Sequence, residues 1–432
     1  MKTKEEIINI IEDEGVEFIR LQFTDMYGNL KNLAVTPSQM DRVLDNRYSF
    51  EAADVFADAY EAEDELYLYP DPDSFVILPW RPQQGKVGRF QCDVRFKDGS
   101  DFFMDPRTVL KRVLKEASDK GYTFYVDPEC EFFLFNTDEN GNPTNDTPEK
   151  AGYMDVGPID FGENARRDMV LMLEEMGFEV ESSHHEKAPG QHEIDFKETE
   201  ALKSADSITM FKFAVRSIAK RFGLYATFMP KPKADAAGSG MHLNISLYKN
   251  DHDLFRDVSA EDGISKEARY FMGGIMAHAG ALCAITNPTV NSYKRIITGY
   301  EAPQYISWAR SGGNPMIKVK DPYDEVKIEL RFPDASANPY LALAVCIAAG
   351  LDGMEQCTDP GEEASAACRN SNAVKLPSDL KEAAMAMKDD PFMEHVLTRD
   401  FVRAYTEAKL SEWDEYMKQV SDWEIDRYLY RM

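Results

Sequence analysis

Two glutamates, Glu186 and Glu193, lie on either side of a turn signal, Pro189-Gly190, within the stretch 183–197. Because apolar and polar side chains alternate after the turn, we expect two short strands in a hairpin that brings the two carboxylates together. Like charges this close raise one another's pKa unless a cation lies between them. Carboxylate oxygens favour Mg²⁺ or Mn²⁺ over zinc, whereas the alternative interpretation is a solvated polar hairpin.

Glu129 and Glu131 form a second acidic pair. They are two residues apart, so on a strand both side chains project from one face, and the apolar run 132–135 follows them. Burying two carboxylates together requires a bound metal ion or a proton. The pair therefore predicts either a metal site at the mouth of a buried strand or two solvated acids at a sheet edge.

A glycine-rich segment, Gly238-Ser239-Gly240, precedes a strand with one polar face. His242, Asn244 and Ser246 share that face, and apolar residues occupy the other. The glycines allow a ligand to approach the main chain closely. Because the chain has no Walker A or dinucleotide-binding pattern, we expect any bound ATP to be held in another way.

Two later segments add guanidinium groups and further acids. We expect 287–303 to be a long, turn-rich loop in which Arg295 binds a carboxylate and Glu301 lies on a mobile flap. The stretch 327–331 alternates, so its lysine, glutamate and arginine lie on one face. This face supplies one more acid for a metal ion and one more guanidinium.

The composition limits the class of protein. With 432 residues, of which 43% are hydrophobic, the chain is long enough for two domains with substantial cores. A formal net charge of −27 disfavours nucleic acid and anionic membrane as partners. Positions 1–14 carry no apolar signal-peptide core, and the longest apolar run, 340–351, is too short to span a bilayer. Six scattered cysteines without a C-x-x-C pair are typical of reduced thiols, so we expect a soluble, cytoplasmic protein.

Short strands dominate the N-terminal part of the chain. After a helix over 4–14, we expect strands at 16–23, 30–35, 66–68, 75–78 and 86–96. A turn signal at 97–100 separates an N-terminal domain, 1–103, from a second domain, 104–432. Asp105-Pro106 predicts the start of a helix that ends near Gly121. Strands then alternate with helices at 163–176, 205–222, 266–285, 339–352 and 401–428, which predicts an α+β fold class.

In this order, the segments resemble bacterial type I glutamine synthetase. The resemblance covers nearly the whole chain, including 18–25 (FIRLQFTD), 226–232 (ATFMPKP) and 407–409 (EAK). It implies an N-terminal β-grasp domain and a C-terminal catalytic domain with a curved antiparallel sheet flanked by helices. It also implies a homo-oligomer, a dodecamer of two hexameric rings whose active sites form between neighbouring subunits.

The resemblance implies a role for each candidate site residue. One divalent metal site would use Glu131, Glu186 and Glu193, and another would use Glu129, His242 and Glu329. Glutamate would be held by Gly238, Arg295, Arg331 and Glu301. ATP would contact Glu181, Ser246 and Lys318. The ammonium pocket would contain Glu51, Tyr153 and Glu186, and the catalytic residues would be Glu301, Arg295 and Glu51.

The reaction implied by the resemblance is ATP-dependent ligation of ammonia to the γ-carboxylate of L-glutamate, through γ-glutamyl phosphate, to give L-glutamine. Two or three Mg²⁺ or Mn²⁺ ions per active site would neutralise the ATP phosphates. Closure of the Glu301 flap would exclude water, which otherwise hydrolyses an acyl phosphate. The stretch 357–376 contains no tyrosine, so we do not expect regulation by adenylylation there.

Some positions depart from the family pattern. Glu51-Ala52-Ala53-Asp54 stands where the family has Asp-Gly-Ser-Ser, and Gly312-Gly313-Asn314 stands where it has Asn-Arg-Ser. Lys318 and Lys327 replace arginines. Loss of an arginine that clamps phosphate can cost about 10³–10⁵ in rate, and Arg310 is close enough in sequence to replace it.

Three alternatives are open. A glutamate–amine ligase of the same fold would accept a larger amine such as a polyamine, because the ammonium pocket has changed and Glu51 and Asp54 add acid to it. A weakly active, glutamine-sensing homologue would bind metal and glutamate without turnover. A zinc hydrolase built on His184, His185 and His192 is disfavoured, because the H-E-x-x-H spacing is absent and carboxylates outnumber imidazoles.

Overall fold

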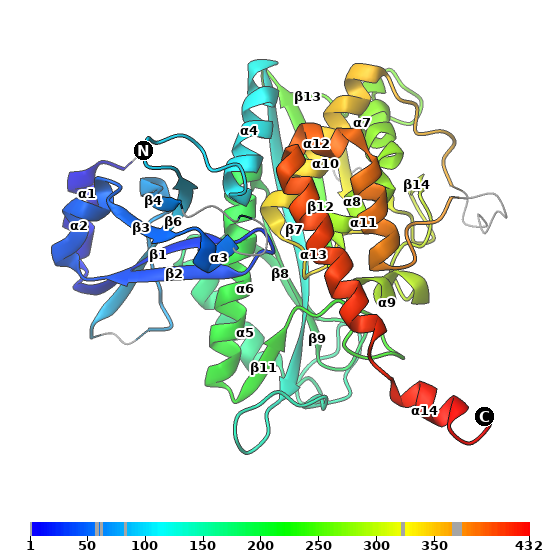
Figure 1. Ribbon diagram of the computed structural model, residues 1–432, viewed down its shortest axis with the longest axis horizontal. Coiled ribbons are helices and arrows are strands. Elements are labelled where there is room, and N and C mark those ends of the chain that lie inside the picture. Colours follow the sequence, from blue (N-terminus) through cyan, green and yellow to red (C-terminus); the bar gives the residue numbers. More distant parts are fainter. Residues whose placement is uncertain (1, 57–59, 61–63, 82–83, 321–324, 365–373) are drawn as a thin grey trace.

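The computed structural model describes residues 2–56, 60, 64–81, 84–320, 325–364 and 374–432, and Cys368 lies outside them. A smaller N-terminal domain lies beside a larger body of helices and strands (Figure 1). The predicted α+β fold class is confirmed.

A six-stranded sheet forms the N-terminal domain, in the order β2-β1-β6-β4-β3, with β5 beside β6. β1 pairs in parallel with β6 and antiparallel with β2, as in a β-grasp fold. The strands are β1 (Val16–Thr24), β2 (Leu30–Val35), β3 (Tyr48–Glu51), β4 (Glu65–Pro70), β5 (Val76–Ile77) and β6 (Lys86–Arg95). The five predicted strands are present; β3 escapes prediction because its side chains are half buried or exposed without alternation.

Helix α1 (Lys4–Asp13) covers this sheet. It begins with a capping box, in which Thr3 Oγ1 accepts from the Glu6 N–H and the Glu6 carboxylate accepts from the Thr3 N–H. Ile7 and Ile11, one turn apart, are buried in the core. The other helical segments here are α2 (Met40–Leu44), α3 (Ala53–Phe56) and the 3₁₀ turns Pro37–Gln39 and Pro72–Ser74.

The larger domain contains a ten-stranded sheet in the order β14-β15-β16-β12-β7-β9-β8, with β10 and β11 paired to β7 and β13 to β12. Its pairings are antiparallel except that of β14 with β15. The central strands are β7 (Tyr122–Asn136) and β12 (Met241–Lys249). The others are β8 (Val180–His185), β9 (Gln191–Phe196), β10 (Thr199–Glu200), β11 (Leu224–Thr227), β13 (His252–Asp253), β14 (Trp308–Ala309), β15 (Ile317–Lys320) and β16 (Lys327–Leu330).

Helices α4 (Pro106–Asp119), α6 (Ala201–Arg221) and α10 (Pro339–Gln356) pack together, and α4 and α6 contact β7. As predicted, Asp105 caps α4, its carboxylate accepting the Thr108 N–H at 3.2 Å. The predicted helix 266–285 is two helices, interrupted at His278, whose ring bonds Asp390 at 2.7 Å. The remaining helices are α5 (Glu163–Glu175), α7 (Lys266–Ala277), α8 (Ala279–Thr286), α11 (Leu380–Asp389), α12 (Pro391–Leu397), α13 (Arg399–Met417) and α14 (Asp422–Tyr428).

The prediction that 287–303 is a loop throughout is wrong. Helix α9 (Val290–Thr298) begins with a capping box between Thr289 and Ser292 and ends at Gly299, whose φ of 66° is left-handed. The helix is only nine residues long and follows Asn287-Pro288, a turn signal that favoured a loop. Arg295 therefore lies on a rigid helix and not on a mobile loop.

One buried guanidinium connects the two domains. Arg107, in the first turn of α4, pairs with Asp93 of β6 at 2.6 Å, with Asp71 at 2.7 Å and with Asp206 of α6 at 2.9 Å. Only 2% of its side chain is exposed. Removing this cation would take a buried partner from all three carboxylates where the domains meet, although Asp93 would keep Lys111 at 2.6 Å.

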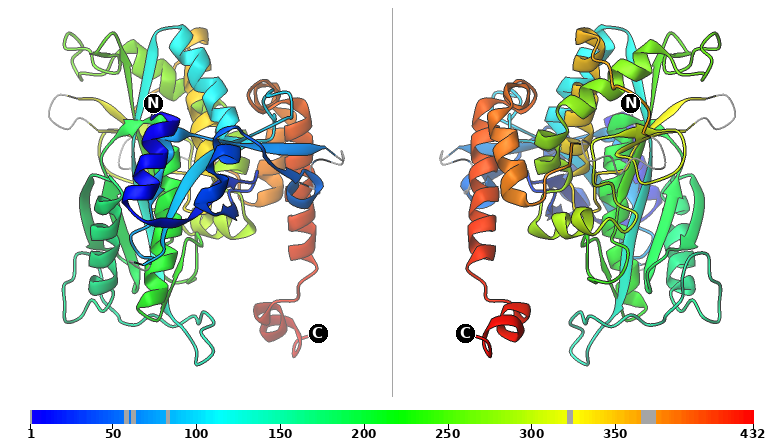
Figure 2. Two further views of the ribbon diagram at one scale, coloured as in Figure 1. Left: turned by 90° about the vertical axis from the view of Figure 1, so that its left-hand side faces the viewer. Right: turned by 90° about the vertical axis from the view of Figure 1, so that its right-hand side faces the viewer.

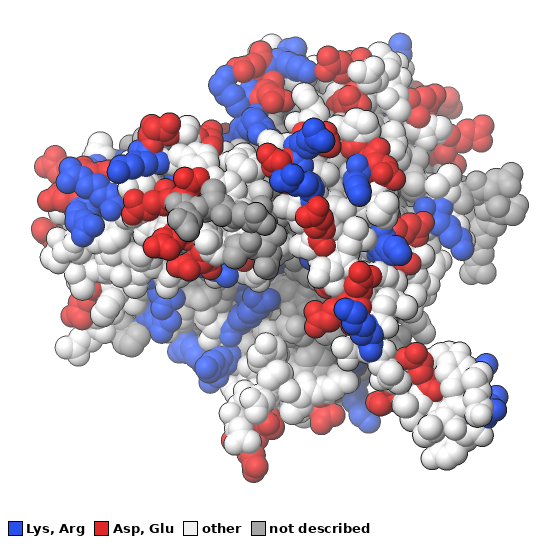
Figure 3. Space-filling model, viewed as in Figure 1, with Lys and Arg blue, Asp and Glu red and all other residues white. Residues whose placement is uncertain are grey.

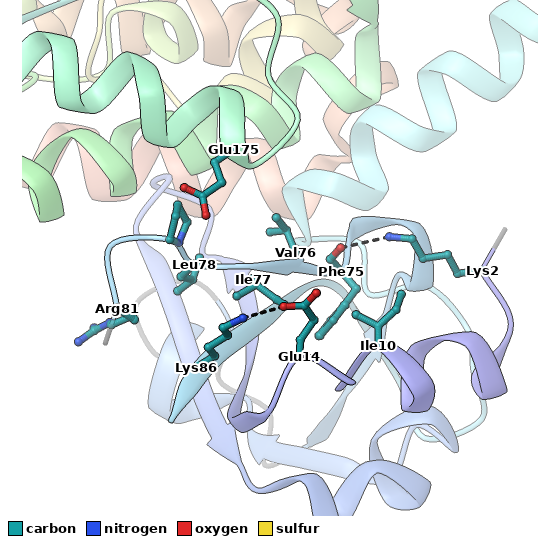
Figure 4. Close-up of a pocket in the computed structure, with 11 residues that line it drawn as sticks. Lys2, Ile10, Glu14, Phe75, Val76, Ile77, Leu78, Arg81, Lys86 and Glu175 are labelled. Carbon is teal, nitrogen blue, oxygen red and sulfur yellow. Dashed lines mark hydrogen bonds and ion pairs between the residues drawn. The ribbon is translucent and has the colours of Figure 1, made fainter. Parts of the chain in front are cut away.

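A cavity of about 360 Å³ lies between the N-terminal domain and the end of α5 (Figure 4). Its lysines already have partners, because Lys86 pairs with Glu14 at 2.7 Å and Lys2 donates to the carbonyl oxygen of Phe75 at 3.2 Å. The acids of the predicted metal sites do not line it. This cavity therefore does not contain the chemistry predicted from the sequence, and those acids lie on or directly beside the large sheet.

The C-terminal helix α14 stands away from the rest of the molecule (Figures 1 and 2). None of its residues is buried, and Trp423 is 62% and Tyr430 88% exposed. Over the described residues, no helix combines the length and the hydrophobicity needed to cross a membrane. Acidic and basic side chains are interspersed over the face shown in Figure 3, so the net charge is not gathered into one patch there.

Candidate active site

The hairpin of β8 and β9 forms as predicted, and Gly190 in its turn has a φ of 71°. It brings Glu186 and Glu193 to the same histidine: His184 Nε2 lies 3.0 Å from Glu186 Oε1 and 3.4 Å from Glu193 Oε2. Hydrogen bonds to these carboxylates raise the pKa of His184 to about 10. Burial raises the pKa of Glu193 well above its usual range. The positive charge expected between the two acids is thus present in the protein itself.

A second group forms where β7, β12 and β16 lie side by side. The Nδ1 atom of His242 lies 3.1 Å from Glu129 Oε2 and 3.6 Å from Glu329 Oε1. Lys320 on β15 reaches into the group, with Nζ 2.6 Å from Glu129 Oε1. Although burial opposes ionisation of Glu129, His242 and Lys320 hold its pKa well below the usual range.

Glu131 lies between the two groups because of the strand register. On β7, Glu129 is opposite His242 of β12, and Glu131 is opposite Glu193 of β9. The Oε2 atom of Glu131 accepts hydrogen bonds from Gln191 Nε2 at 2.9 Å and from the Gly240 N–H at 2.8 Å. Burial raises its pKa. Glu129 and Glu131 thus project from one face of β7, and each lies beside a different group.

The donor sets suit divalent cations. His184, Glu186 and Glu193 offer ligand atoms within 4.8 Å of one another, and so do Glu129, His242 and Glu329. The Oε2 atom of Glu329 is buried and accepts no hydrogen bond from any described residue. Carboxylate oxygens with one imidazole are ligands that Mg²⁺ and Mn²⁺ accept. The residues present therefore fit such ions.

Two guanidiniums lie beside the acids. Arg295 is 3% exposed and is held by the carbonyl oxygens of Arg331 and Phe332, each at 3.1 Å. Arg331 Nη1 lies 2.6 Å from Glu329 Oε1. A Cβ atom on Gly238 would lie 2.2 Å from the carbonyl oxygen of Pro230, so only glycine fits there. The buried arginine is therefore fixed before any anionic ligand arrives.

Glu301 lies in the segment after α9, which was predicted to form a flap. Its φ is 62°, an uncommon value for a residue other than glycine. Its carboxylate pairs with Lys187 Nζ at 2.7 Å, and both side chains are about half exposed. The ring of Tyr153 lies edge-on to His184, with 5.5 Å between the ring centroids.

A cavity of about 380 Å³ connects these groups. Ten of the predicted site residues line it: Glu129, Glu131, Tyr153, Glu186, Glu193, Gly238, His242, Arg295, Glu301 and Arg331. Five do not: Glu51, Glu181, Ser246, Lys318 and Glu329.

Some of the predicted residues that do not line the cavity adjoin it, and others lie farther away. Glu329 contacts the lining residue His242, and Lys318 Nζ lies 3.9 Å from Glu329, so both adjoin the cavity. Ser246 donates to Glu198 at 3.3 Å, farther along β12. Glu51 ends β3 in the other domain and is exposed.

Several lining residues were not predicted from the sequence: His184 as an acid partner, Lys187, Gln191, Asp195 and Tyr300. Lys187 directly follows Glu186, and this adjacency was the available signal. Lys320 belongs to the second group. It is two residues from the predicted Lys318 on β15, so the two lysine side chains project from the same face of the strand. Arg310, considered as a substitute phosphate clamp, instead pairs with Glu363 at 3.1 Å and does not line the cavity.

The other two hairpin histidines lie behind the site. His185 and His192 are fully buried and lie close to Asp160. Arg166 already supplies a cation here, since its Nη1 lies 2.8 Å from both Asp160 Oδ2 and His192 Nδ1. The three histidines thus belong to two different environments, which gives the zinc hydrolase alternative no common centre.

A curved antiparallel sheet with two acid–imidazole groups and fixed guanidiniums defines a class of protein, the metal-dependent enzymes that act on anionic substrates. Residues 15–97 match the family model described as the β-grasp domain of glutamine synthetase. Residues 103–428 match the model of its catalytic domain. The chain therefore belongs to the glutamine synthetase family, as the resemblance indicated.

Relatives and solved structures agree with this assignment. The chain is 49% identical to glutamine synthetase of Clostridium saccharobutylicum over 436 residues, which cover 99% of this chain and 98% of the relative. It is 45% identical to that of Staphylococcus aureus strain Mu50 over 437 residues, with the same coverage. The structure of GmaS in complex with ADP has a TM-score of 0.90 and 32% identity, covering 98% of this chain and 99% of GmaS. Glutamine synthetase of Plasmodium falciparum, 24% identical over 99% of both chains, shares the fold with a TM-score of 0.88.

Proposed function

We propose that this protein ligates ammonia to the γ-carboxylate of L-glutamate, coupled to cleavage of ATP to ADP and phosphate, and releases L-glutamine. Membership of the glutamine synthetase family supports this reaction, as do relatives of that name that match nearly the whole chain. The observation that carries the proposal is the convergence of two acid–imidazole groups on one cavity beside buried Arg295.

Two Mg²⁺ or Mn²⁺ sites are proposed, the first on Glu131, Glu186 and Glu193 and the second on Glu129, His242 and Glu329. When bound, such ions neutralise the phosphates of ATP. The protein's own residues set their positions, because strand register holds the acids in place and Gln191 and Gly240 fix Glu131. His184 and Lys320 contribute further positive charge beside the same carboxylates.

The substrate roles follow the charges that line the cavity. Arg295 and Arg331, with the main chain at Gly238, would hold the carboxylate end of glutamate. Its γ-carboxylate would attack the terminal phosphorus of ATP, and ammonia would then displace phosphate from γ-glutamyl phosphate. Glu301 would accept a proton from ammonium, and closure of its segment would exclude water.

The acceptor pocket would contain Tyr153 and Glu186 from this chain and Glu51 of the partner subunit. The nucleotide would lie along β12 and β15, near Glu181, Ser246 and Lys318. GmaS, 32% identical, has a structure in complex with ADP, which supports nucleotide binding on this fold. With glycine at position 313, Lys318 and Lys320, which lie beside Glu329 and Glu129, would stabilise the transferring phosphate.

The proposed assembly is a homo-oligomer, a dodecamer of two hexameric rings, in the cytoplasm. Uncovered apolar side chains support association: Trp423 and Tyr430 near the C-terminus, and Val156 and Phe161 in the segment before α5, are all more than half exposed. A domain boundary between 103 and 104 agrees with the start of α4 at Pro106.

The experiment is a coupled assay of ADP release with glutamate, MgATP and one acceptor at a time: ammonium, methylamine or putrescine. We expect turnover with ammonium to exceed that with either amine. Glu131→Gln serves as the inactive control. Turnover with an amine but not with ammonium would assign a glutamate–amine ligase, and metal and glutamate binding without ADP release would assign a sensor.

A further inference from the structure

An ammonium group of the protein itself lies among the residues of the proposed acceptor pocket. Lys187 Nζ is 2.7 Å from Glu301 Oε2 and 5.7 Å from the centroid of the Tyr153 ring. Its main-chain N–H donates to Glu186 Oε2 at 2.9 Å. Lys187 thus contacts all three residues of this chain that are proposed to receive the acceptor amine.

The chemistry of these contacts is that of a cation site. Glu301 supplies a carboxylate, Tyr153 an aromatic face within cation–π distance, and Glu186 a second negative charge. A lysine side chain is cationic at neutral pH, and Glu301 pairs with it directly. Among the described residues that line the cavity, Lys187 is the only lysine.

The position of Lys187 distinguishes short acceptors from long ones. Its side chain is 46% exposed, at the mouth of the cavity, whereas Glu193 and Arg295 lie in the buried interior. Ammonium, with one charge, can bind beyond Lys187 at the inner acids. A diamine with its reacting nitrogen at the same place must extend its second ammonium past Lys187, where like charges repel.

We propose that Lys187 is a specificity-determining residue, which favours ammonium and excludes diamines and polyamines by charge repulsion at the cavity mouth. This inference rests on the proposed function, since it concerns the acceptor of the same reaction. Two unit charges about 5 Å apart, in a partly solvated site, change relative affinity by roughly tenfold. Methylamine, which has no second charge, should not experience this discrimination.

The test compares acceptors in wild type, Lys187→Met and Lys187→Glu, using the full-length protein at constant ionic strength. The measured quantity is the kcat/KM for putrescine divided by that for ammonium, from ADP release. We expect this ratio to rise about tenfold in Lys187→Met and further in Lys187→Glu, while the methylamine-to-ammonium ratio changes little. Added salt should reduce the difference between the variants.

Lys115→Met is the matched control, because Lys115 also pairs with a carboxylate, Asp119, but lies on α4 away from the cavity. It should leave both ratios unchanged. A putrescine ratio that stays within twofold of wild type in both Lys187 variants would overturn this inference while ammonium turnover upholds the proposed function. Absence of ammonium turnover in wild type would instead overturn the proposed function, and the inference with it.

Discussion

Glu149 holds the β8–β9 hairpin, which carries proposed metal ligands, from behind, and replacing it with glutamine should loosen the site. Its buried carboxylate accepts hydrogen bonds from the Gly190 N–H at 2.6 Å and from the Ala151 N–H, and it pairs with His185 Nε2 at 3.0 Å. The other ring nitrogen of His185 lies 2.6 Å from the carbonyl oxygen of Glu186. Both nitrogens therefore face oxygen atoms, so the ring links Glu149 to Glu186, a proposed metal ligand.

The magnitude follows from these contacts. Glutamine retains one acceptor oxygen, but its amide hydrogens would face N–H donors. The negative charge that Glu149 places beside His185 would also be lost. A hydrogen bond to a charged group contributes about 1.5–3 kcal/mol, so losing one and weakening another should cost roughly 3 kcal/mol. Because residues behind metal ligands typically change metal affinity by about 10–100-fold, we expect Mn²⁺ to bind Glu149→Gln at least about tenfold more weakly.

The assay is Mn²⁺ titration followed by electron paramagnetic resonance, with thermal unfolding measured on the same samples. Glu163→Gln is the control, because Glu163 accepts the Gly157 N–H at 3.0 Å but is exposed and does not line the cavity. It should bind Mn²⁺ as wild type does. If Glu149→Gln is folded and binds Mn²⁺ within twofold of wild type, the hairpin does not depend on this carboxylate and the reasoning is refuted.

Three predictions concern other buried charges. Burial raises the pKa of Asp105 to about 7, so the folded protein is more stable when this carboxyl is protonated. That stability is fully present below about pH 4 and is lost as pH rises through 7. Asp105→Asn should therefore raise Tm relative to wild type at pH 8 but not at pH 4, and equal Tm shifts at the two pH values would contradict this. Arg107→Met should lower the free energy of urea unfolding by about 3–5 kcal/mol, because Asp71 and Asp206 lose this buried cation and Asp93 keeps only its lysine and Arg95 partners. A loss below about 1 kcal/mol would contradict this. Lys320→Gln removes a competing cation from Glu129 and should tighten Mn²⁺ binding about tenfold, whereas weaker binding would show that Lys320 supports the site.

The first acid group could be predicted because its geometry is local. Glu186 and Glu193 belong to one hairpin, and a turn signal with alternation determines that they meet. The pairing of Glu129 and Glu131 on one face likewise follows from strand period alone. The sequence could not indicate the register between strands, which places His242 opposite Glu129 and Glu193 opposite Glu131.

Helix α9 shows why the environment of Arg295 escaped prediction. Its first turn has the Thr-x-x-Ser pattern of a cap, but a short helix draws most of its stability from tertiary packing, which local pattern does not report. The consequence is functional, since an arginine on a capped helix is preorganised for a carboxylate whereas one on a loop is not. The predicted loop setting of Arg295 was wrong, and its role in binding a carboxylate stays a prediction.

The contacts of Lys187 and Glu149 could not be predicted from the sequence. Glu149 meets Gly190 across 41 residues, and Lys187 meets Glu301 across the interval between the hairpin and the flap. No period or motif encodes either contact, because each depends on where an irregular segment crosses the sheet. The proposed metal ligands are constrained by strand alternation, so the sequence indicates their chemistry. The proposed acceptor choice depends on side chains that loops bring to the cavity mouth, so it follows only from the folded chain.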